Sequence, residues 1–310
     1  MKNNEIIGHK DIISRLDQAV INKHVASAFL FSGPDGIGKK LVALRLAQAL
    51  NCRQFNSEGP CQQCASCRKI AALNHVEVKV ITREEKAKNL KIEQIFQLQA
   101  DISLRPVEAD KKVYIIDDAH TLTRDAANCL LKTLEEPPLD SLLILITANP
   151  SVLLSTVLSR CQKIKFKSLP RQEVMRRLQE EGALASDSAH FLADFAGGSL
   201  GLAQVFLEKG ILEKKAELDE FIEGMPQEDI TAVLARAQTY GRDKEQAKIW
   251  LDLLLYTCAQ RYHSICALPE PSTERYEEII ELILRAKKDL TVNVNLQLAL
   301  ENIFLRMRHA

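Results

Sequence analysis

The sequence lacks an excess of charge of either sign, long hydrophobic runs, and an abundance of glycine or proline. Lysine plus arginine and aspartate plus glutamate both number 41 among 310 residues, so the formal net charge is zero. A protein that binds DNA or anionic lipid through its overall field needs a basic excess, which this chain does not have. With 12 glycines, 10 prolines and 46% hydrophobic residues, the composition excludes collagen-like order and intrinsic disorder. The length predicts about two globular domains, or three small ones.

Segments that would direct the chain to a membrane or across one are also missing. The first residues, MKNNEIIGHKDII, carry no apolar core of the kind found in secretory signals. The longest apolar run, residues 142–146, falls far short of the ~20 residues that span a bilayer. We therefore expect a cytoplasmic protein without membrane contact. Eight cysteines are too sparse for a disulfide scaffold, but four of them crowd into residues 52–67, which indicates a metal site in a reducing compartment.

Residues 28–166 alternate between short apolar runs of strand type and longer helical stretches, the pattern of a parallel sheet covered by helices. The helical stretches place apolar residues at three- and four-residue spacing. The predicted strands are residues 28–32, 76–81, 113–117, 142–147 and 162–166, and the predicted helices between them are residues 39–50, 92–102 and 125–134. Pro137 and Pro138 end the last helix, because proline lacks the amide hydrogen and clashes with the preceding turn.

The strand pattern stops at Ser168-Leu169-Pro170, and everything beyond it is helical in pattern. A small helical unit is predicted at residues 169–210, with helices at 171–181 and 187–195. Apolar stripes suited to a helical bundle follow within residues 211–310. They lie at residues 230–240, 247–262 and 276–287. The expected organisation is therefore an α/β domain at 1–168, a small helical domain at 169–210 and an all-helical domain at 211–310.

The segment from Gly33 to Lys40, GPDGIGKK, follows the first predicted strand and opens a helix, as a phosphate-binding loop does. Gly33, Gly36 and Gly38 would let backbone N–H groups approach phosphate oxygens, and Lys39 would reach the outer phosphates. The motif is broken at its last position, where Lys40 replaces the hydroxyl that holds Mg²⁺. A tight turn that has kept its shape and lost its ligand fits the same residues. ATP binding at this degenerate site is therefore doubtful, and productive hydrolysis more so.

Two acids follow the third predicted strand. Asp117 stands where a carboxylate would orient Mg²⁺ and its waters. Asp118 occupies the position of the longer glutamate that aligns the attacking water in ATPases of this class. Two acids at a strand end can equally be solvated or cap the next helix. Because Lys40 already weakens the metal site, we favour that role over catalysis.

The cysteines Cys52, Cys61, Cys64 and Cys67 have the spacing of a metal site. Two short intervals bring three thiolates within reach of one ion at ~2.3 Å, and Cys52 can complete the tetrahedron. Four cysteine ligands leave no position for water, so we predict a structural zinc in an insertion at residues 52–67. An iron–sulfur cluster is disfavoured because the cysteine and proline of the ferredoxin pattern are absent after Cys67. Free thiols are the remaining alternative.

These motifs occur together with two further segments, residues 126–138 (AANCLLKTLEEPP) and 158–161 (LSRC). In this order and spacing they resemble the delta prime family of subunits from the clamp loader of bacterial DNA polymerase III, which are AAA+ proteins. The resemblance implies an AAA+ module with a five-stranded parallel sheet and helices on both faces at 1–168, a helical lid at 169–210 and a helical collar for oligomerisation at 211–310. Residues 293–301 resemble the last collar helix.

The resemblance also assigns a role to Arg160. In clamp loaders the arginine of a Ser-Arg-Cys motif projects across a subunit boundary toward ATP on the neighbour, where a guanidinium can neutralise charge on the γ-phosphate. Without the family relation, the residues favour a surface arginine whose stem covers apolar area over an arginine finger. Gly201 departs from the Gly-Ser-Leu-Arg run of the hydrolysing relatives. With Lys40 and Asp118 it makes three departures that indicate an inert site.

The function implied by the resemblance is a largely ATPase-inert stator within the DNA polymerase III holoenzyme. It would supply an arginine finger in trans and help load the sliding clamp onto primed DNA during replication. The implied partners are gamma/tau and delta type subunits, the sliding clamp, and primer–template DNA through the assembled complex. The main alternative is an ATP-hydrolysing subunit of the gamma/tau type, which Lys40 and Gly201 disfavour. A zinc-dependent nucleic-acid-binding module is disfavoured by the zero net charge.

Overall fold

The computed structural model describes residues 6–84, 87, 89–182, 184–268, 273–290 and 296–308. The chain divides into two compact units, Met1–Val205 and Phe206–Ala310. The boundary predicted after residue 168 lies inside the first unit, and the three-part division stays a prediction. Among the described helices, none combines the length and the apolar character needed to cross a membrane.

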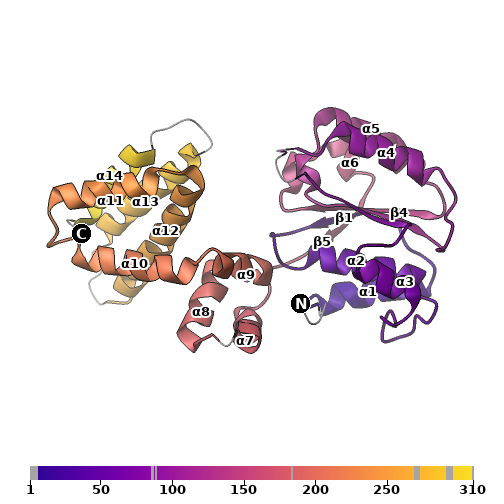
Figure 1. Ribbon diagram of the computed structural model, residues 1–310, viewed down its shortest axis with the longest axis horizontal. Coiled ribbons are helices and arrows are strands. Elements are labelled where there is room, and N and C mark those ends of the chain that lie inside the picture. Colours follow the sequence, from indigo (N-terminus) through magenta and orange to yellow (C-terminus); the bar gives the residue numbers. More distant parts are fainter. Residues whose placement is uncertain are drawn as a thin grey trace. The chain divides into compact units, whose positions relative to one another are not determined.

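The first unit contains a five-stranded sheet in which all strands run parallel (Figure 1). The strands are β1 (Ala28–Ser32), β2 (Val78–Ile81), β3 (Lys112–Ile116), β4 (Ser141–Thr147) and β5 (Gln162–Lys165), in the order β2-β3-β4-β1-β5. The predicted five-stranded parallel sheet is confirmed. Strand β2 begins two residues later than predicted, because the Val78 N–H bonds to the His75 carbonyl at 3.2 Å and closes a turn there.

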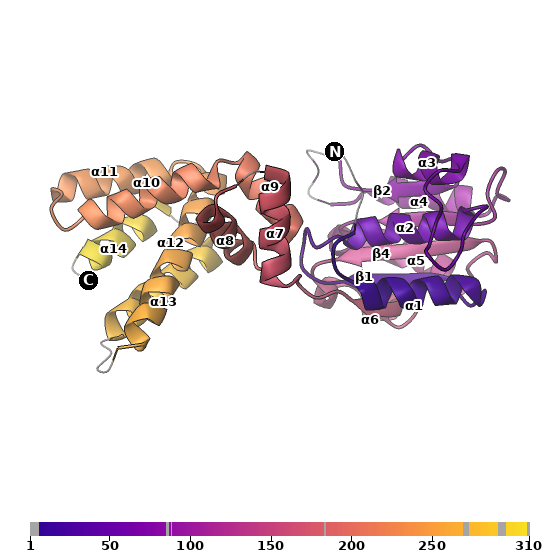
Figure 2. The same ribbon diagram turned by 90° about the horizontal axis from the view of Figure 1, so that it is seen from below.

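Helices cover both faces of this sheet, as predicted (Figure 1). One face packs against α1 (Lys10–Ile21), α2 (Lys39–Asn51) and α3 (Ala65–Ala71), and the other against α4 (Ile92–Ile102), α5 (Arg124–Glu135) and the short α6 (Ser155–Leu158). Strand β4 is buried along its whole length. Ile144 lies in the core on the face covered by α1, α2 and α3, and Leu143 lies in the core on the face covered by α4, α5 and α6. Figure 2 shows α1 and α2 in front of the strands. The two-sided burial explains why the strands are continuous apolar runs.

The first unit also contains α7 (Arg171–Gly182) and α8 (Ser186–Phe195), and it contains the start of α9 (Leu200–Glu208). Helices α7 and α8 pack against each other. Buried apolar residues on both, among them Val174 and Leu192, supply the packing surface. Both helices lie within one residue of their predicted bounds at each end, which confirms a helical lid.

The second unit is all-helical in its described part, as predicted. Its helices are α10 (Ile211–Gly224), α11 (Ile230–Gly241), α12 (Lys244–Cys266), α13 (Glu274–Asp289) and α14 (Leu296–Arg308). Aromatic rings form the centre of its core: Tyr240 stacks on Trp250 at 3.9 Å between centroids, and Phe221 meets Phe304 at 5.0 Å. Of the segment that resembles the last collar helix, residues 293–295 lie outside the described residues, and α14 begins at Leu296.

Candidate functional site

The loop between β1 and α2 has the backbone of a phosphate-binding turn. Gly36 (φ 70°) and Gly38 (φ 97°) are both left-handed, a conformation that L side chains rarely adopt. Gly38 is the N-cap of α2, and a Cβ on it would meet no atom within 4 Å. The loop borders a cavity of about 490 Å³ at the ends of β3 and β4. The shape expected of a phosphate loop is therefore present.

Lys39 directs its ammonium group at the loop itself. Its Nζ donates to the carbonyl oxygens of Gly33 at 2.6 Å and Pro34 at 2.5 Å, and lies 3.7 Å from Asp35 Oδ1. Lys39 is only 6% exposed. Burial lowers the pKa of Lys39, while the charges of Asp35 and Asp117 oppose this shift. A phosphate would have to draw this lysine away from two backbone carbonyls.

Lys40 forms an ion pair with the acid at the end of β3. Its Nζ lies 3.3 Å from Asp117 Oδ2, and both side chains are partly exposed. An ammonium group has three donors and no lone pair, so it cannot ligate a metal. It competes with Mg²⁺ for the same carboxylate oxygen. The residues present at this position therefore do not fit a nucleotide-bound Mg²⁺.

Asp118 is ion-paired as well. Arg83, which follows β2, places its Nη2 at 2.9 Å and its Nε at 3.3 Å from Asp118 Oδ2. Asp118 precedes the 3₁₀ turn Ala119–Thr121, but its side chain makes no capping hydrogen bond to that turn. The structure therefore contradicts the helix-capping alternative for Asp118, while both acids stay partly exposed to solvent and each forms an ion pair. Sequence reasoning missed Arg83, because nothing in its neighbourhood indicates a partner 35 residues away.

The start of α9 rests directly on the phosphate loop. Ser199 Oγ donates to the Asp35 carbonyl at 2.7 Å, and the Gly201 N–H donates to the Gly36 carbonyl at 2.9 Å. A Cβ on Gly201 would lie 2.8 Å from the Gly36 oxygen, so a side chain cannot be added there without moving the backbone. The position that the resemblance associates with a nucleotide-contacting arginine is therefore in backbone contact with the loop.

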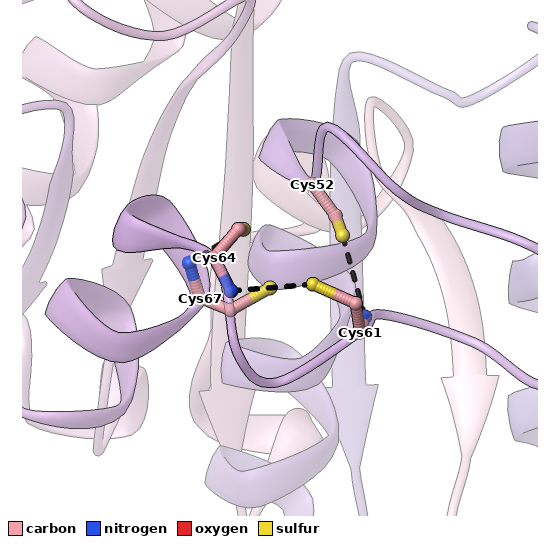
Figure 3. Close-up of side chains that lie close together, drawn as sticks. All are labelled: Cys52, Cys61, Cys64 and Cys67. Carbon is pink, nitrogen blue, oxygen red and sulfur yellow. Dashed lines mark hydrogen bonds between the residues drawn. The ribbon is translucent and has the colours of Figure 1, made fainter.

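The four cysteines converge at the other end of α2 (Figure 3). Cys52 follows the last residue of α2, Cys64 caps α3, Cys67 lies in the first turn of α3, and Cys61 lies in the loop between the helices. One sulfur from each lies within 4.8 Å of the others. The amide of Cys61 donates to Cys52 Sγ at 3.3 Å, that of Cys64 to Cys61 Sγ at 3.3 Å, and that of Cys67 to Cys64 Sγ at 3.4 Å. Such amide donors favour the thiolate form that a metal binds.

The thiol pKa values show opposing influences in this cluster. Burial raises the pKa of Cys64, but hydrogen bonds from neighbouring amides and thiols outweigh it and lower that pKa to about 6. Backbone hydrogen bonds also lower the pKa of Cys61, whereas burial raises the pKa of Cys52 and Cys67. Four thiol ligands with amide donors fit a tetrahedral zinc ion. Bound there, zinc would cross-link α2, the loop and α3, and would supply no reaction chemistry.

Arg160 lies in the loop between α6 and β5, with 35% of its side chain exposed. Its Nη2 is 2.7 Å from Glu135 Oε1, and its Nη1 donates to the Thr156 carbonyl at 3.0 Å. The next residue, Cys161, is buried against the α5 face of the sheet and anchors the loop, and burial raises its thiol pKa to about 11. Arg160 does not line the cavity beside the phosphate loop.

The structure thus gathers Gly36, Gly38, Lys39 and Asp117 at one cavity, with Gly33 supplying a carbonyl to Lys39, and keeps the cysteine cluster separate. Sequence reasoning found all of these residues. It missed the long-range partners, which are Arg83, Glu135 and Ser199. Glu135 and Ser199 lie in segments used for the resemblance, but no local sequence signal indicates the partner of any of the three, because each meets a residue far away in the chain.

Comparison with known proteins identifies the family. The family described as "DNA polymerase III, delta subunit" matches residues 8–170, more than half of the chain. DNA polymerase III subunit delta' of Bacillus subtilis (strain 168) is 28% identical over 96% of this chain and 95% of that protein. Subunit tau of the same organism is 32% identical over 67% of this chain but only 37% of its own length. Subunit tau/gamma of Haemophilus influenzae is 28% identical over 97% of this chain and 49% of its own length.

The chain therefore spans almost all of the delta' relative but less than half of the two tau-type relatives. A solved structure of a gamma subunit-related protein from Thermotoga maritima is similar with a TM-score of 0.49 and 19% identity, over 96% of this chain and 98% of that one. The chain belongs to the DNA polymerase III delta subunit family of AAA+ clamp-loader subunits.

Proposed function

We propose that this clamp-loader subunit is a stator of the delta prime type, which hydrolyses no ATP of its own and donates Arg160 to ATP held by a neighbouring subunit. In this role it helps load the sliding clamp onto primed DNA during replication. Its partners are gamma/tau and delta type subunits, the clamp and, through the assembled complex, primer–template DNA. The observation that carries the proposal is the Lys40–Asp117 ion pair.

The ion pair supports inertness because hydrolysis requires Mg²⁺ beside the β- and γ-phosphates. At 3.3 Å the Lys40 ammonium neutralises the carboxylate that would hold the metal and its waters. Lys39 is bound to loop carbonyls, and Asp118 is bound to Arg83. Each residue that would bind phosphate, metal or the attacking water is thus engaged by another group. Several ion pairs and hydrogen bonds would have to break together before a nucleotide could be split.

The exposure of Arg160 supports its action in trans. Arginine stays charged at any physiological pH and presents several N–H donors in one plane, which suits phosphate oxygens. Where arginine fingers have been characterised, they raise hydrolysis rates on the order of 10³- to 10⁵-fold. The short α6 and the buried Cys161 hold the Arg160 backbone against the core while the guanidinium reaches the surface.

The comparisons support the delta prime type through a relative of that name. DNA polymerase III subunit delta' of Bacillus subtilis aligns over 96% of this chain and 95% of its own length. A second candidate is an ATP-hydrolysing subunit of the gamma/tau type. It is favoured by the 32% identity to tau, which exceeds the 28% identity to delta'. Turnover of ATP by the isolated chain distinguishes the two candidates.

The test therefore has two steps. The purified chain is first incubated with Mg²⁺ and ATP; turnover that Lys39→Ala abolishes would establish the gamma/tau candidate and reject the stator. The chain is then reconstituted with gamma/tau and delta type subunits, and ATPase rates are compared for the wild type, Arg160→Ala and Arg176→Ala. Arg176 is a matched control, because its side chain is 66% exposed on α7 and lies outside the Ser-Arg-Cys motif.

We expect Arg160→Ala to assemble normally and to lose the share of the rate that comes from the neighbour's site. Only the neighbour's site loses its guanidinium, so the total ATPase rate falls by that site's share. The loss is larger if the ATP sites of the complex must hydrolyse in a fixed order. Arg176→Ala should behave as the wild type. Equal rates for all three proteins at equal assembly would reject the transfer of Arg160.

A further inference from the structure

Glu135 holds the guanidinium of Arg160 from one side. Glu135 is the last residue of α5, and its Oε1 lies 2.7 Å from Arg160 Nη2. On the other side, Arg160 Nη1 donates to the Thr156 carbonyl at 3.0 Å and lies 3.4 Å from Ser159 Oγ. Both terminal nitrogens of the guanidinium are therefore held, and its plane is set before any partner arrives.

The ion pair cannot be explained by the stability of the fold. Arg160 is 35% exposed and Glu135 is 51% exposed, and ion pairs in water at such exposure contribute little to folding. An acid in the last turn of a helix is also unfavourable, because the helix C-terminus carries partial negative charge. Glu135 is thus a poor choice for α5 taken alone. Its carboxylate is useful where a cation must be held at that helix end.

The position of the Glu135 backbone is well defined. Helix α5 starts at a Thr123 cap, whose hydroxyl accepts from the Ala126 amide, and buries Leu130 and Leu134 in the core. Pro137 and Pro138 prevent the helix from continuing, so it ends at Glu135. A carboxylate on a rigid element can set the direction of a flexible arginine on a neighbouring loop.

We propose that Glu135 is a positioning residue for Arg160: it orients the guanidinium toward the ATP of the neighbouring subunit. This inference rests on the proposed function of Arg160. The three contacts with Glu135, Thr156 and Ser159 take three of the five N–H groups of the guanidinium. Two N–H groups remain for phosphate oxygens, so the ion pair can persist while Arg160 serves the reaction. The effect of Glu135 is therefore on the rate of the chemical step, with little effect on ATP binding.

The test uses the reconstituted complex with Glu135→Ala, Glu135→Gln and Glu136→Ala. Glu136 is the matched control: it is the adjacent exposed acid, and within the described residues its carboxylate has no recorded partner. Glu135→Ala should lower kcat at the affected site about fivefold, the effect expected from losing one exposed charge pair, while KM for ATP changes little. Glu135→Gln keeps an acceptor oxygen and should fall between the wild type and Glu135→Ala. Glu136→Ala should match the wild type in both constants.

A double variant separates this inference from the proposed function. In the Arg160→Ala background, Glu135→Ala should have no further effect on kcat, because its action passes through the guanidinium. If Arg160→Ala itself leaves the rate unchanged, the proposed function fails. If Arg160→Ala lowers the ATPase rate, whereas Glu135→Ala leaves that rate unchanged or increases it, only the positioning role of Glu135 fails. Should Glu135→Ala impair assembly, measured by gel filtration, the comparison of Glu135→Gln with Glu136→Ala decides the same question.

Discussion

Two glycines of the phosphate loop, Gly36 and Gly38, provide a sharp test of the contact between this loop and α9. Both have positive φ, so an alanine at either position is strained. They differ in their surroundings: a Cβ on Gly36 would lie 2.5 Å from Ser199 Oγ and 2.7 Å from the Leu202 amide nitrogen, whereas a Cβ on Gly38 would meet nothing within 4 Å. Gly36→Ala should therefore destabilise the first unit more than Gly38→Ala does.

The magnitudes follow from these two contributions. The left-handed conformation costs an alanine about 1–2 kcal/mol, which is the whole expected cost of Gly38→Ala. Gly36→Ala adds an overlap with backbone that no rotamer change can relieve, and overpacking of this kind costs about 1–3 kcal/mol. We therefore expect Gly36→Ala to lower the free energy of unfolding by about 2–5 kcal/mol. Removing the Ser199 hydroxyl in the Gly36→Ala background should recover only part of this, since the Leu202 amide still lies in the way.

Urea unfolding followed by far-UV circular dichroism measures the loss. The fluorescence of Trp250, the single tryptophan, reports on the second unit and should not change. Hydrogen exchange locates the effect: the Gly201 amide, which donates to the Gly36 carbonyl, should exchange faster in Gly36→Ala than in Gly38→Ala. Equal destabilisation by the two variants, with equal exchange at Gly201, would show that α9 does not rest on the loop.

Three further outcomes are expected. Cys64→Ser should remove one zinc per chain by metal analysis and lower the Tm, whereas Cys129→Ser, outside the cluster, should retain zinc; equal metal content would contradict the zinc site. Lys40→Thr should make binding of a non-hydrolysable ATP analogue dependent on Mg²⁺, because the carboxylate of Asp117 is then free for the metal. ATP itself should still not be hydrolysed, because Asp118 stays paired with Arg83. Binding of the analogue that is unchanged by Mg²⁺ would contradict the competition at Asp117. Burial raises the pKa of Asp101, but hydrogen bonds from Lys79 and Tyr114 outweigh it and hold that pKa below its ordinary 3.8. The stabilisation is therefore present above pH 3.8 and is lost as pH falls through the folded-state pKa. Asp101→Asn should lower the free energy of unfolding by about 1 kcal/mol at pH 7 and by progressively less in acid. A difference between the variant and the wild type that does not vary with pH would contradict this.

The sheet of the first unit could be predicted because its signals are local. A buried parallel strand is a short apolar run, and an amphipathic helix repeats its apolar residues every three or four positions, so both are visible in consecutive residues. Helix α4 has the bounds that its periodicity predicts. Helix α1 was not predicted, although Ile12, Ile13, Leu16 and Val20 have the spacing of an apolar face and pack against the core. Its start is unmarked, because its N-cap, His9, makes no capping hydrogen bond from its side chain. Helix α3 begins inside the cysteine insertion and has only seven residues, too few for a periodic signal.

The sequence alone determined the order of strands and helices, the broken phosphate loop and the four-cysteine cluster, because each depends on the spacing of residues close together in the chain. Only the tertiary structure decided what these residues contact: Lys40 meets Asp117, Arg83 meets Asp118, Gly201 meets Gly36, and Glu135 meets Arg160. Ion pairs and hydrogen bonds act over a few ångströms, and parallel strands joined by helical crossovers bring distant residues together at one edge of the sheet. The residue order contains no direct record of those distances, so the partners of Lys40, Asp118 and Arg160 are seen only when the chain is folded.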